Sequence, residues 1–154
     1  MQFAGDATIV IPSLIVSSMI NIGPMMIYAG QELGEQATDA EGYSGKDGRT
    51  TIFDYWSVPT LRRWYNNGKC NGEALTSREK WLRDEYSKIL SLCNKEKAIS
   101  QGSFYDLMYV NYENSTLNPH DQYVFLRNFE NETLIIAVNF CHLPLISFSI
   151  LSIT

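Results

Sequence analysis

Gly23-Pro24-Met25-Met26-Ile27-Tyr28-Ala29-Gly30-Gln31-Glu32-Leu33-Gly34 is the stretch that decides the fold class of this chain. Five consecutive apolar or aromatic residues, at positions 25–29, stand between a Gly-Pro pair and Gly30. Such a run, bounded by turn residues, predicts a strand buried on both faces, as in a parallel sheet. The strand would end at Gln31 and Glu32, and polar side chains just past the carboxyl ends of parallel strands lie where ligands bind. An ordinary strand-to-loop exit has the same pattern, so the spacing alone leaves both interpretations open.

A largely buried helix is predicted before this strand, from about residue 7 to residue 21. Its apolar residues run nearly round the helical cylinder, and the Gly-Pro pair ends it. A helix this apolar that leads into a buried strand cannot cover its own surface, so we expect the two to be one unit of a larger layered structure. The uncovered surface of Ile9 to Ala29 would then favour self-association.

A run without helical or strand periodicity follows, from residue 35 to about Pro59. Structureless stretches of this length are uncommon inside compact domains and tend to be binding loops or lids. The run mixes charged and aromatic residues, including Arg49, Asp54 and Trp56. Carboxylates that bond hydroxyls and flat rings that cover the apolar faces of sugars suit a carbohydrate cleft. A solvated loop pinned by one aromatic cluster would contain the same residues.

Two helices are predicted after this run. A short one covers Leu61 to Gly68, and a longer amphipathic one opens at Thr76, because Thr76 and Glu79 have the spacing of a capping box. In the longer helix the apolar residues follow one stripe, at positions 82, 86, 89, 90 and 93. We expect this helix to lie on a core and to have a structural role.

From residue 100 the pattern changes from helical to alternating, which predicts an antiparallel sheet. Strands are expected at residues 105–111, 122–128, 133–140 and 145–153, with a tight hairpin turn at 128–131. Leu134, Ile136 and Val138 should face one side of the sheet. The alternation slips at Ile150 and Leu151, so a bulge is expected there. The last strand would be an edge that can pair with another strand.

The sequence resembles the α-amylase family, glycoside hydrolase family thirteen, around the eighth strand of its barrel. The resemblance is carried by the Gly-Pro strand that ends in Gly30, Glu32 and Gly34, and by the run DGRTTIFDYW at positions 47–56. It implies an α+β chain in which residues 1–100 are the terminal helix-strand-loop-helix piece of a (β/α)8 barrel and residues 101–154 are a partial antiparallel β domain. A complete barrel needs roughly 250 residues, so the 154 residues of this chain would be a piece.

This resemblance implies a retaining enzyme that acts on α-glucans or maltooligosaccharides through an Asp nucleophile, a Glu acid/base and a second Asp. In the family these residues precede the eighth strand, so we assign no catalytic residue to this chain and expect it to be inactive alone. Gln31 and Glu32 would hold the cleft floor, and Arg49, Asp54 and Trp56 would shape the loop beside it. A simpler role for Glu32 is to accept hydrogen bonds from loop amides. The alternatives are a non-catalytic carbohydrate-binding module and a structural module that oligomerises.

The composition argues against several other classes. A formal net charge of -5, without a Lys/Arg cluster, argues against a nucleic-acid partner. The three cysteines are far apart and odd in number, so neither a disulfide framework nor a metal site is expected, and no cofactor is implied. Residues 7–31 contain no charge, but Pro12 and the Gly-Pro pair interrupt the run and no Lys or Arg flanks it, so we expect neither a membrane span nor a signal peptide. The chain should be soluble, in a compartment that the sequence leaves open.

Overall fold

The computed structural model describes residues 6–36, 58–113, 116–141 and 148–153. The chain divides into two compact units, one formed by residues 1–10 and 26–87 and the other by residues 11–25 and 88–154. Each unit is described by itself below. Within the described ranges, no helix is both long enough and apolar enough to cross a bilayer.

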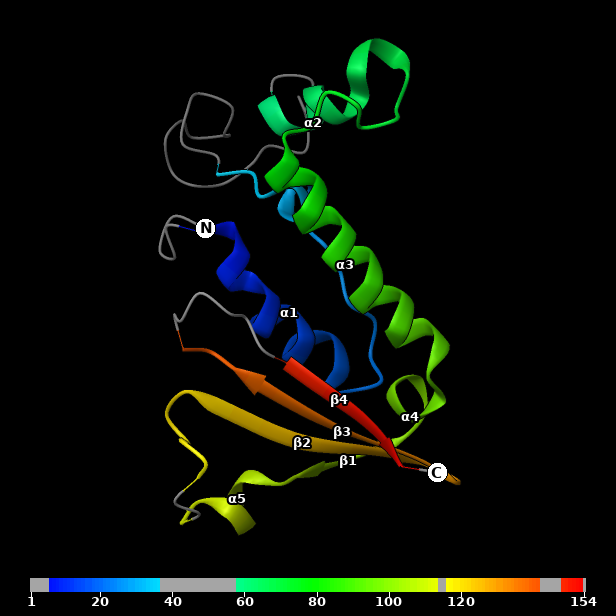
Figure 1. Cartoon of the computed structure of the whole chain (residues 1–154). Helices are drawn as coiled ribbons and strands as arrows, with labels where there is room; N and C mark the ends of the chain where they lie inside the picture. The colour runs from blue at the N-terminus through cyan, green and yellow to red at the C-terminus, as the bar shows by residue number, and fades with distance from the viewer. Residues whose placement is uncertain (1–5, 37–57, 114–115, 142–147, 154) are drawn as a thin grey trace. The chain divides into compact units, whose positions relative to one another are not determined.

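The first unit is built from short helices and the start of one long helix (Figure 1). Its elements are η1 (Ala7–Ile9), η2 (Gln31–Leu33), α2 (Pro59–Tyr65), η4 (Asn66–Gly68) and the first half of α3 (Ser77–Lys95). α2 starts at Pro59, whose fixed φ and missing N–H suit the first turn of a helix. The predicted helices at 61–68 and from Thr76 are thus confirmed in kind, with ends shifted by a few residues.

The stripe predicted for α3 is confirmed by burial. Leu82, Tyr86 and Ile89 are all at most 3% exposed. The capping box is present too, since the Thr76 N–H donates to Glu79 Oε2 (2.9 Å) and the Glu79 N–H donates to Thr76 Oγ1 (3.3 Å). The two bonds satisfy backbone donors that would otherwise lack partners at the start of the helix.

The strand predicted at residues 25–29 is not present. The stretch from Pro24 to Tyr28 has no regular secondary structure, and Met26 is 88% exposed. A strand needs a neighbour to satisfy its backbone N–H and C=O groups, and a parallel strand buried on both faces needs two. None of the described segments pairs with this stretch, so its apolar residues are left without the environment that their pattern predicts.

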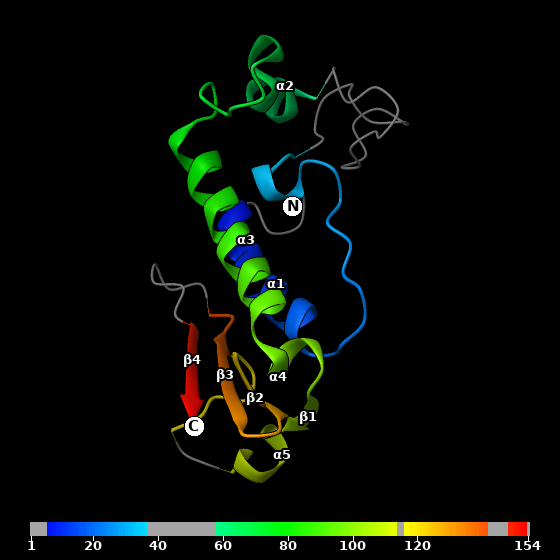
Figure 2. The ribbon, with the colours of Figure 1, turned by 90° about the vertical axis from the view of Figure 1, so that its right-hand side faces the viewer.

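The second unit is a four-stranded antiparallel sheet with helices, and it contains most of α1 (Val10–Met19). The strands are β1 (Ser103–Asp106), β2 (Gln122–Phe129), β3 (Glu132–Asn139) and β4 (Phe148–Ile153), in the spatial order β1-β2-β3-β4. Two short helices, α4 (Lys97–Ser100) and α5 (Met108–Asn111), flank β1 in sequence. Figures 1 and 2 show α1 on one side of the sheet and α5 at the other.

The inner face of the sheet, on the side of α1, forms the core of this unit. Phe125, Leu134, Ile136 and Val138 are at most 3% exposed, as the predicted alternation requires. Arg127 is also on this face and is 1% exposed. The guanidinium is held by backbone carbonyls, because it donates to Ile20 O (3.2 Å), Ala98 O (3.1 Å), Ile99 O (2.7 Å) and Gly102 O (2.8 Å).

Two expectations for the strands are wrong. The first strand covers 103–106 and not 105–111, because the Asp106 carboxylate accepts the Met108 N–H (2.8 Å) and the chain turns into α5. The bulge expected at Ile150 and Leu151 does not occur, since β3 and β4 pair without a slip from Thr133–Ile153 to Val138–Phe148. The strands predicted at 122–128 and 133–140 and the turn between them are confirmed, as β2 and β3 with ends shifted by one residue.

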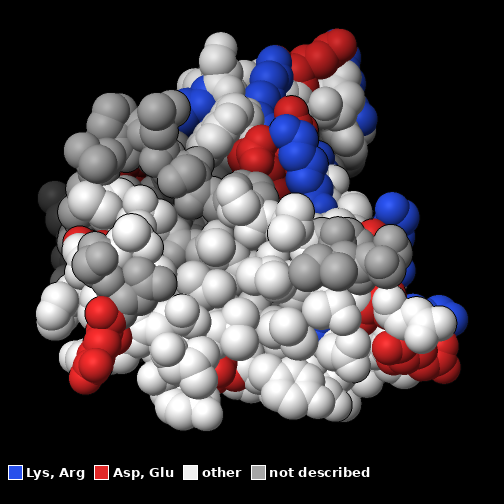
Figure 3. Space-filling model, turned by 60° about the horizontal axis from the view of Figure 1, so that its bottom comes forward, with Lys and Arg blue, Asp and Glu red and all other residues white. Residues whose placement is uncertain are grey.

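The outer face of the sheet, on the side of α5, is neutral. The pairing register places no Lys, Arg, Asp or Glu among the described residues of this face. Its apolar and aromatic members are Tyr105, Val124, Leu126, Ile135, Ala137 and Leu151. Figure 3, turned to bring this side forward, shows few charged residues on it.

Candidate functional site

Gln31, expected at the cleft floor, is fixed to α3. Its side-chain Nε2 donates to the Tyr86 hydroxyl oxygen (3.0 Å), and its Oε1 accepts the Tyr28 N–H (3.2 Å). Both ends of the amide are therefore used within the first unit. The Gln31 side chain therefore links the turn after Tyr28 to α3.

Glu32 lies beside Gln31 and is half-buried. With the described residues its carboxylate makes no hydrogen bond, so the expected bonds to loop amides are not found there. Burial raises the pKa of Tyr86, the hydrogen bond from Gln31 opposes this, and the negative charge of Glu32 adds to the increase. Glu32 is thus close enough to the Tyr86 hydroxyl to act on it electrostatically.

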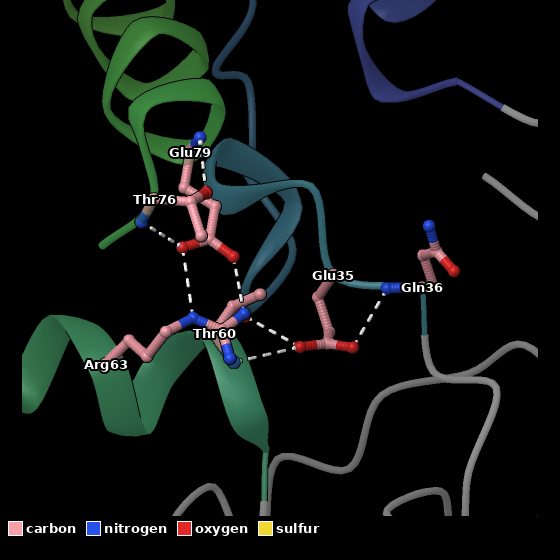
Figure 4. Close-up of polar contacts among 6 residues, drawn as sticks. All are labelled: Glu35, Gln36, Thr60, Arg63, Thr76 and Glu79. Carbon is pink, nitrogen blue, oxygen red and sulfur yellow. Dashed lines mark hydrogen bonds and ion pairs between the residues drawn. The ribbon is translucent and has the colours of Figure 1, made fainter. Parts of the chain in front are cut away.

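Glu35 accepts hydrogen bonds from residues on both sides of the segment 37–57, while the bonds from loop amides to Glu32 stay a prediction. Its Oε1 accepts the Gln36 N–H (2.9 Å), and its Oε2 accepts both the Thr60 N–H (3.2 Å) and the Thr60 hydroxyl (2.7 Å). Thr60 is only 6% exposed. Figure 4 shows the carboxylate between the chain at Gln36 and the first turn of α2. One carboxylate therefore contacts Gln36, before the segment 37–57, and Thr60, after it.

Arg63 and Glu79 form a second link, between α2 and α3 (Figure 4). Arg63 Nε donates to Glu79 Oε2 (3.1 Å) while Nη2 contacts Oε1, the two-pronged geometry that suits a guanidinium and a carboxylate. Burial tends to raise the pKa of Glu79, but the hydrogen bonds from Arg63 and Thr76 outweigh it and hold the pKa below its ordinary value. The carboxylate thus stays ionised while it caps α3 and pairs with Arg63.

The turn that leads into Glu35 has a backbone that favours glycine. Gly30 and Gly34 have φ of 81° and 76°, in the left-handed region, and they flank η2. The Glu35 N–H donates to Gly30 O (3.0 Å), which closes the turn. A Cβ at Gly34 would lie 2.9 Å from the Ala7 Cβ, so this position has no space for a side chain. Gly30 and Gly34, which are part of the family resemblance, thus allow the turn that brings Glu35 to Thr60.

These contacts involve residues on either side of the segment 37–57. Three of the five residues predicted for the site, Arg49, Asp54 and Trp56, fall in that segment and lie outside the described residues. Gln31 and Glu32 lie near its start. The sequence analysis missed Thr60 and Arg63 as anchors, because their partners are 25 and 16 residues away and nothing in the local pattern marks them.

The described residues could position a catalytic site, but they do not form one themselves. Retaining hydrolysis needs two carboxylates roughly 5 Å apart that are free to act on the glycosidic bond. Glu35 and Glu79 are both occupied by hydrogen-bond donors. Within the described ranges there is also no group of three His, Cys, Asp or Glu residues placed to hold a metal ion. A small cavity of about 150 Å³ lies beside the network, lined by Leu33, Gly34, Gln36, Thr76 and Glu79 among others.

Comparison with known proteins gives matches among solved structures. No protein-family model matches the sequence, and no curated protein matches it. AmyP in complex with maltose matches with a TM-score of 0.53 and 16% identity, over 87% of this chain and 24% of AmyP. An AmyP variant in complex with maltotriose matches with a TM-score of 0.51 and 17% identity, over 85% of this chain and 24% of that chain. Isomaltulose synthase from Klebsiella sp. LX3 gives 0.49 and 18%, over 86% and 30%.

These neighbours are α-amylase family enzymes, as the resemblance of the sequence led us to expect. At these identities the AmyP matches show a shared fold. This chain, with its helices and four-stranded antiparallel sheet, spans about a quarter of the length of AmyP.

Proposed function

We propose that this chain is the C-terminal portion of a retaining, α-glucan-active glycoside hydrolase. Residues 1–100 would belong to the end of the catalytic barrel, and residues 101–154 to the β domain that follows it. The observation that carries the proposal is the fold shared with AmyP over 87% of this chain, against only 24% of AmyP. The solved AmyP structures contain maltose and maltotriose, which points to oligomers of α-linked glucose as the ligand class.

In this proposal the chain supplies one wall of the substrate cleft. Gln31 and Glu32 would stand at the floor, and Arg49, Asp54 and Trp56 would shape the loop beside it. The catalytic Asp, Glu and Asp would come from the preceding part of the protein. Positioning matters here because a displacement of about 1 Å in a supporting element can cost roughly a hundredfold in rate. The Glu35–Thr60 and Arg63–Glu79 links would provide that positioning for both ends of the loop.

The test is to express the whole reading frame that contains this chain and to assay it on maltoheptaose. We expect release of shorter maltooligosaccharides with retained anomeric configuration, and no release by residues 1–154 alone. A reading frame that encodes no further barrel strands before residue 1, or a whole protein without activity on α-glucans, would contradict the proposal. Product formation by residues 1–154 alone would contradict the assignment of the catalytic residues elsewhere.

Glu32 can be tested in the same whole protein. Glu32→Ala should lower turnover or the melting temperature, because the variant removes a half-buried side chain that this proposal places at the cleft floor. Glu32→Gln is the matched control for shape. If activity and melting temperature both stay unchanged in Glu32→Ala, this residue does not belong to the site.

The second candidate function is a non-catalytic carbohydrate-binding module. It is favoured by exposed aromatic side chains in the second unit, among them Tyr109 and Tyr112. Calorimetric titration of residues 1–154 with maltoheptaose distinguishes the two candidates, because a piece of a catalytic cleft should bind weakly whereas a binding module should saturate. A structural, self-associating module stays a third proposal. Ile22, Met26 and Tyr28 are 49% to 88% exposed, and sedimentation as a monomer would contradict it.

A further inference from the structure

Two Asn-Gly pairs stand in the connection between α2 and α3 (Figure 1), and the structure holds them differently. The pairs are Asn67-Gly68 and Asn71-Gly72. An asparagine before a glycine exposes its side-chain amide to attack by the next backbone nitrogen, because glycine has no Cβ that blocks the approach. As dipeptides the two pairs are equivalent, so their surroundings in the fold decide which of them reacts.

The second pair is held at both of its reacting groups. Asn71 Oδ1 accepts the side-chain N–H of Asn66 (2.9 Å) and the backbone N–H of Glu73 (3.2 Å). The attacking atom of this pair would be the Gly72 nitrogen, whose N–H donates to Trp64 O (3.2 Å). Gly72 is also buried. The loop must therefore open locally, with loss of these bonds, before the two groups of this pair can meet.

The first pair is open. Asn67 and Gly68 are both exposed, and the Asn67 side chain makes no hydrogen bond with the part of the chain that the structure describes. For a Cβ built at Gly68 the nearest atom would be the Tyr65 hydroxyl oxygen, at 3.5 Å, which is an ordinary contact. Asn67 has a φ of 54°, in the left-handed region that asparagine tolerates better than most residues. No side-chain hydrogen bond has to break before this amide turns toward the next nitrogen.

We propose that Asn67 is a site of spontaneous deamidation and that Asn71 is protected from it. The Gly68 nitrogen attacks Asn67 Cγ, so a new N–C bond forms and the bond from Cγ to the side-chain nitrogen breaks. The proton of the Gly68 N–H leaves with that nitrogen as ammonia, and a cyclic imide is left. Water then opens either of the two carbonyl–nitrogen bonds of the imide and gives aspartate or isoaspartate at position 67. The reaction consumes only water.

The product places a new carboxylate near arginines. Asn67 lines an open cavity of about 340 Å³ together with Arg62, Arg63 and Asn66. Arg63 is paired with Glu79, whereas the Arg62 guanidinium makes no ion pair or hydrogen bond with the described residues. A carboxylate at position 67 can therefore pair with Arg62, and an exposed pair of this kind changes stability little. The modified chain should stay folded, with one negative charge more than the net charge of -5.

The experiment incubates residues 1–154 at mildly alkaline pH and follows both asparagines by mass spectrometry of proteolytic peptides. We expect Asn67 to be modified at least about tenfold faster than Asn71, because two hydrogen bonds to one side chain correspond to a factor of this order in a local opening equilibrium. Anion exchange should separate the modified chain, since it carries the extra charge. Asn67→Gln should remove the fast reaction and leave the rate at Asn71 unchanged.

The role of the fold is tested in two ways. In concentrated urea the hydrogen bonds around Asn71 are lost, so the two rates should become similar. Asn66→Gly removes the donor to Asn71 Oδ1, while glycine suits the positive φ of 47° at this position. We expect Asn71 to react at least about threefold faster in this variant, the effect of one lost hydrogen bond. Circular dichroism confirms that each variant is folded.

Equal rates at the two asparagines in the folded chain, a faster reaction at Asn71, or no reaction at Asn67 would each overturn the inference. A rate difference that persists in urea would assign the contrast to neighbouring residues along the chain, and would overturn it as well. None of these outcomes bears on the proposed function, which is tested separately by cleavage of maltoheptaose.

Discussion

Replacing Arg127 with methionine should destabilise the second unit strongly. Arg127 is 1% exposed and donates four hydrogen bonds to backbone carbonyls, and no carboxylate among the described residues pairs with it. The carbonyls belong to Ile20, Ala98, Ile99 and Gly102, so one side chain joins the end of α1 to the α4–β1 connection. Methionine has a similar length and fills space, but it donates nothing.

The magnitude follows from two opposing effects. Four hydrogen bonds from a charged donor at about 1.5 kcal/mol each give roughly 6 kcal/mol. Removing the cation returns part of the cost of taking it out of water, a cost that also lowers the pKa of Arg127. We therefore expect a net loss of about 3 kcal/mol in the free energy of unfolding, a large share of the roughly 5–15 kcal/mol of a typical domain.

Urea unfolding followed by far-ultraviolet circular dichroism measures this loss. With a urea m-value of about 1–3 kcal/mol per M, the midpoint should fall by roughly 1–3 M. Arg83→Met is the matched control, because Arg83 is exposed and its guanidinium carbon lies 6.0 Å from the centre of the Trp64 ring, a contact worth about 1 kcal/mol or less. Arg127→Lys keeps the charge but not the fork and should fall between the two. A change below about 1 kcal/mol in Arg127→Met would refute the reasoning.

Three further predictions concern the first unit. Thr60→Val removes the hydroxyl that Glu35 accepts but keeps the backbone N–H bond, so unfolding should be easier by about 1 kcal/mol, and Thr60→Ser should behave as the unsubstituted chain. Gly34→Ala places a Cβ 2.9 Å from the Ala7 Cβ at a φ of 76°, and should cost more than about 1 kcal/mol in the same assay, whereas a melting temperature equal to that of the unsubstituted chain would show that the turn can relax. For Glu79→Gln the pH matters. The pKa of Glu79 is lower in the folded chain than its ordinary value of 4.5, so its contribution is present above pH 4.5 and is lost as the pH falls through the folded pKa. The difference in unfolding free energy between the unsubstituted chain and Glu79→Gln should shrink in that acid range, and a difference independent of pH would contradict the assignment.

Periodic patterns in the sequence predicted the elements that are stabilised by residues near one another along the chain. The capping box at Thr76 and Glu79 and the stripe through Leu82 to Ile89 needed only helical periodicity, and both are present. The alternation at 132–139 likewise identified the buried side of β3. The strand predicted at 25–29 failed for the opposite reason, because an apolar run becomes a strand only where neighbouring strands accept its hydrogen bonds.

The sequence by itself determined that the chain is an α+β protein with a helix start at Thr76, an antiparallel sheet after residue 100 and glycines at the turn before Glu35. It also determined the family resemblance that the fold shared with AmyP supports. Tertiary structure alone decided that Glu35, and not Glu32, holds Thr60, that Arg63 pairs with Glu79, and that Arg127 is buried against four carbonyls. The reason is that a hydrogen bond between residues 25 or 107 positions apart leaves no periodic trace along the chain, since each partner's own neighbours would allow other pairings.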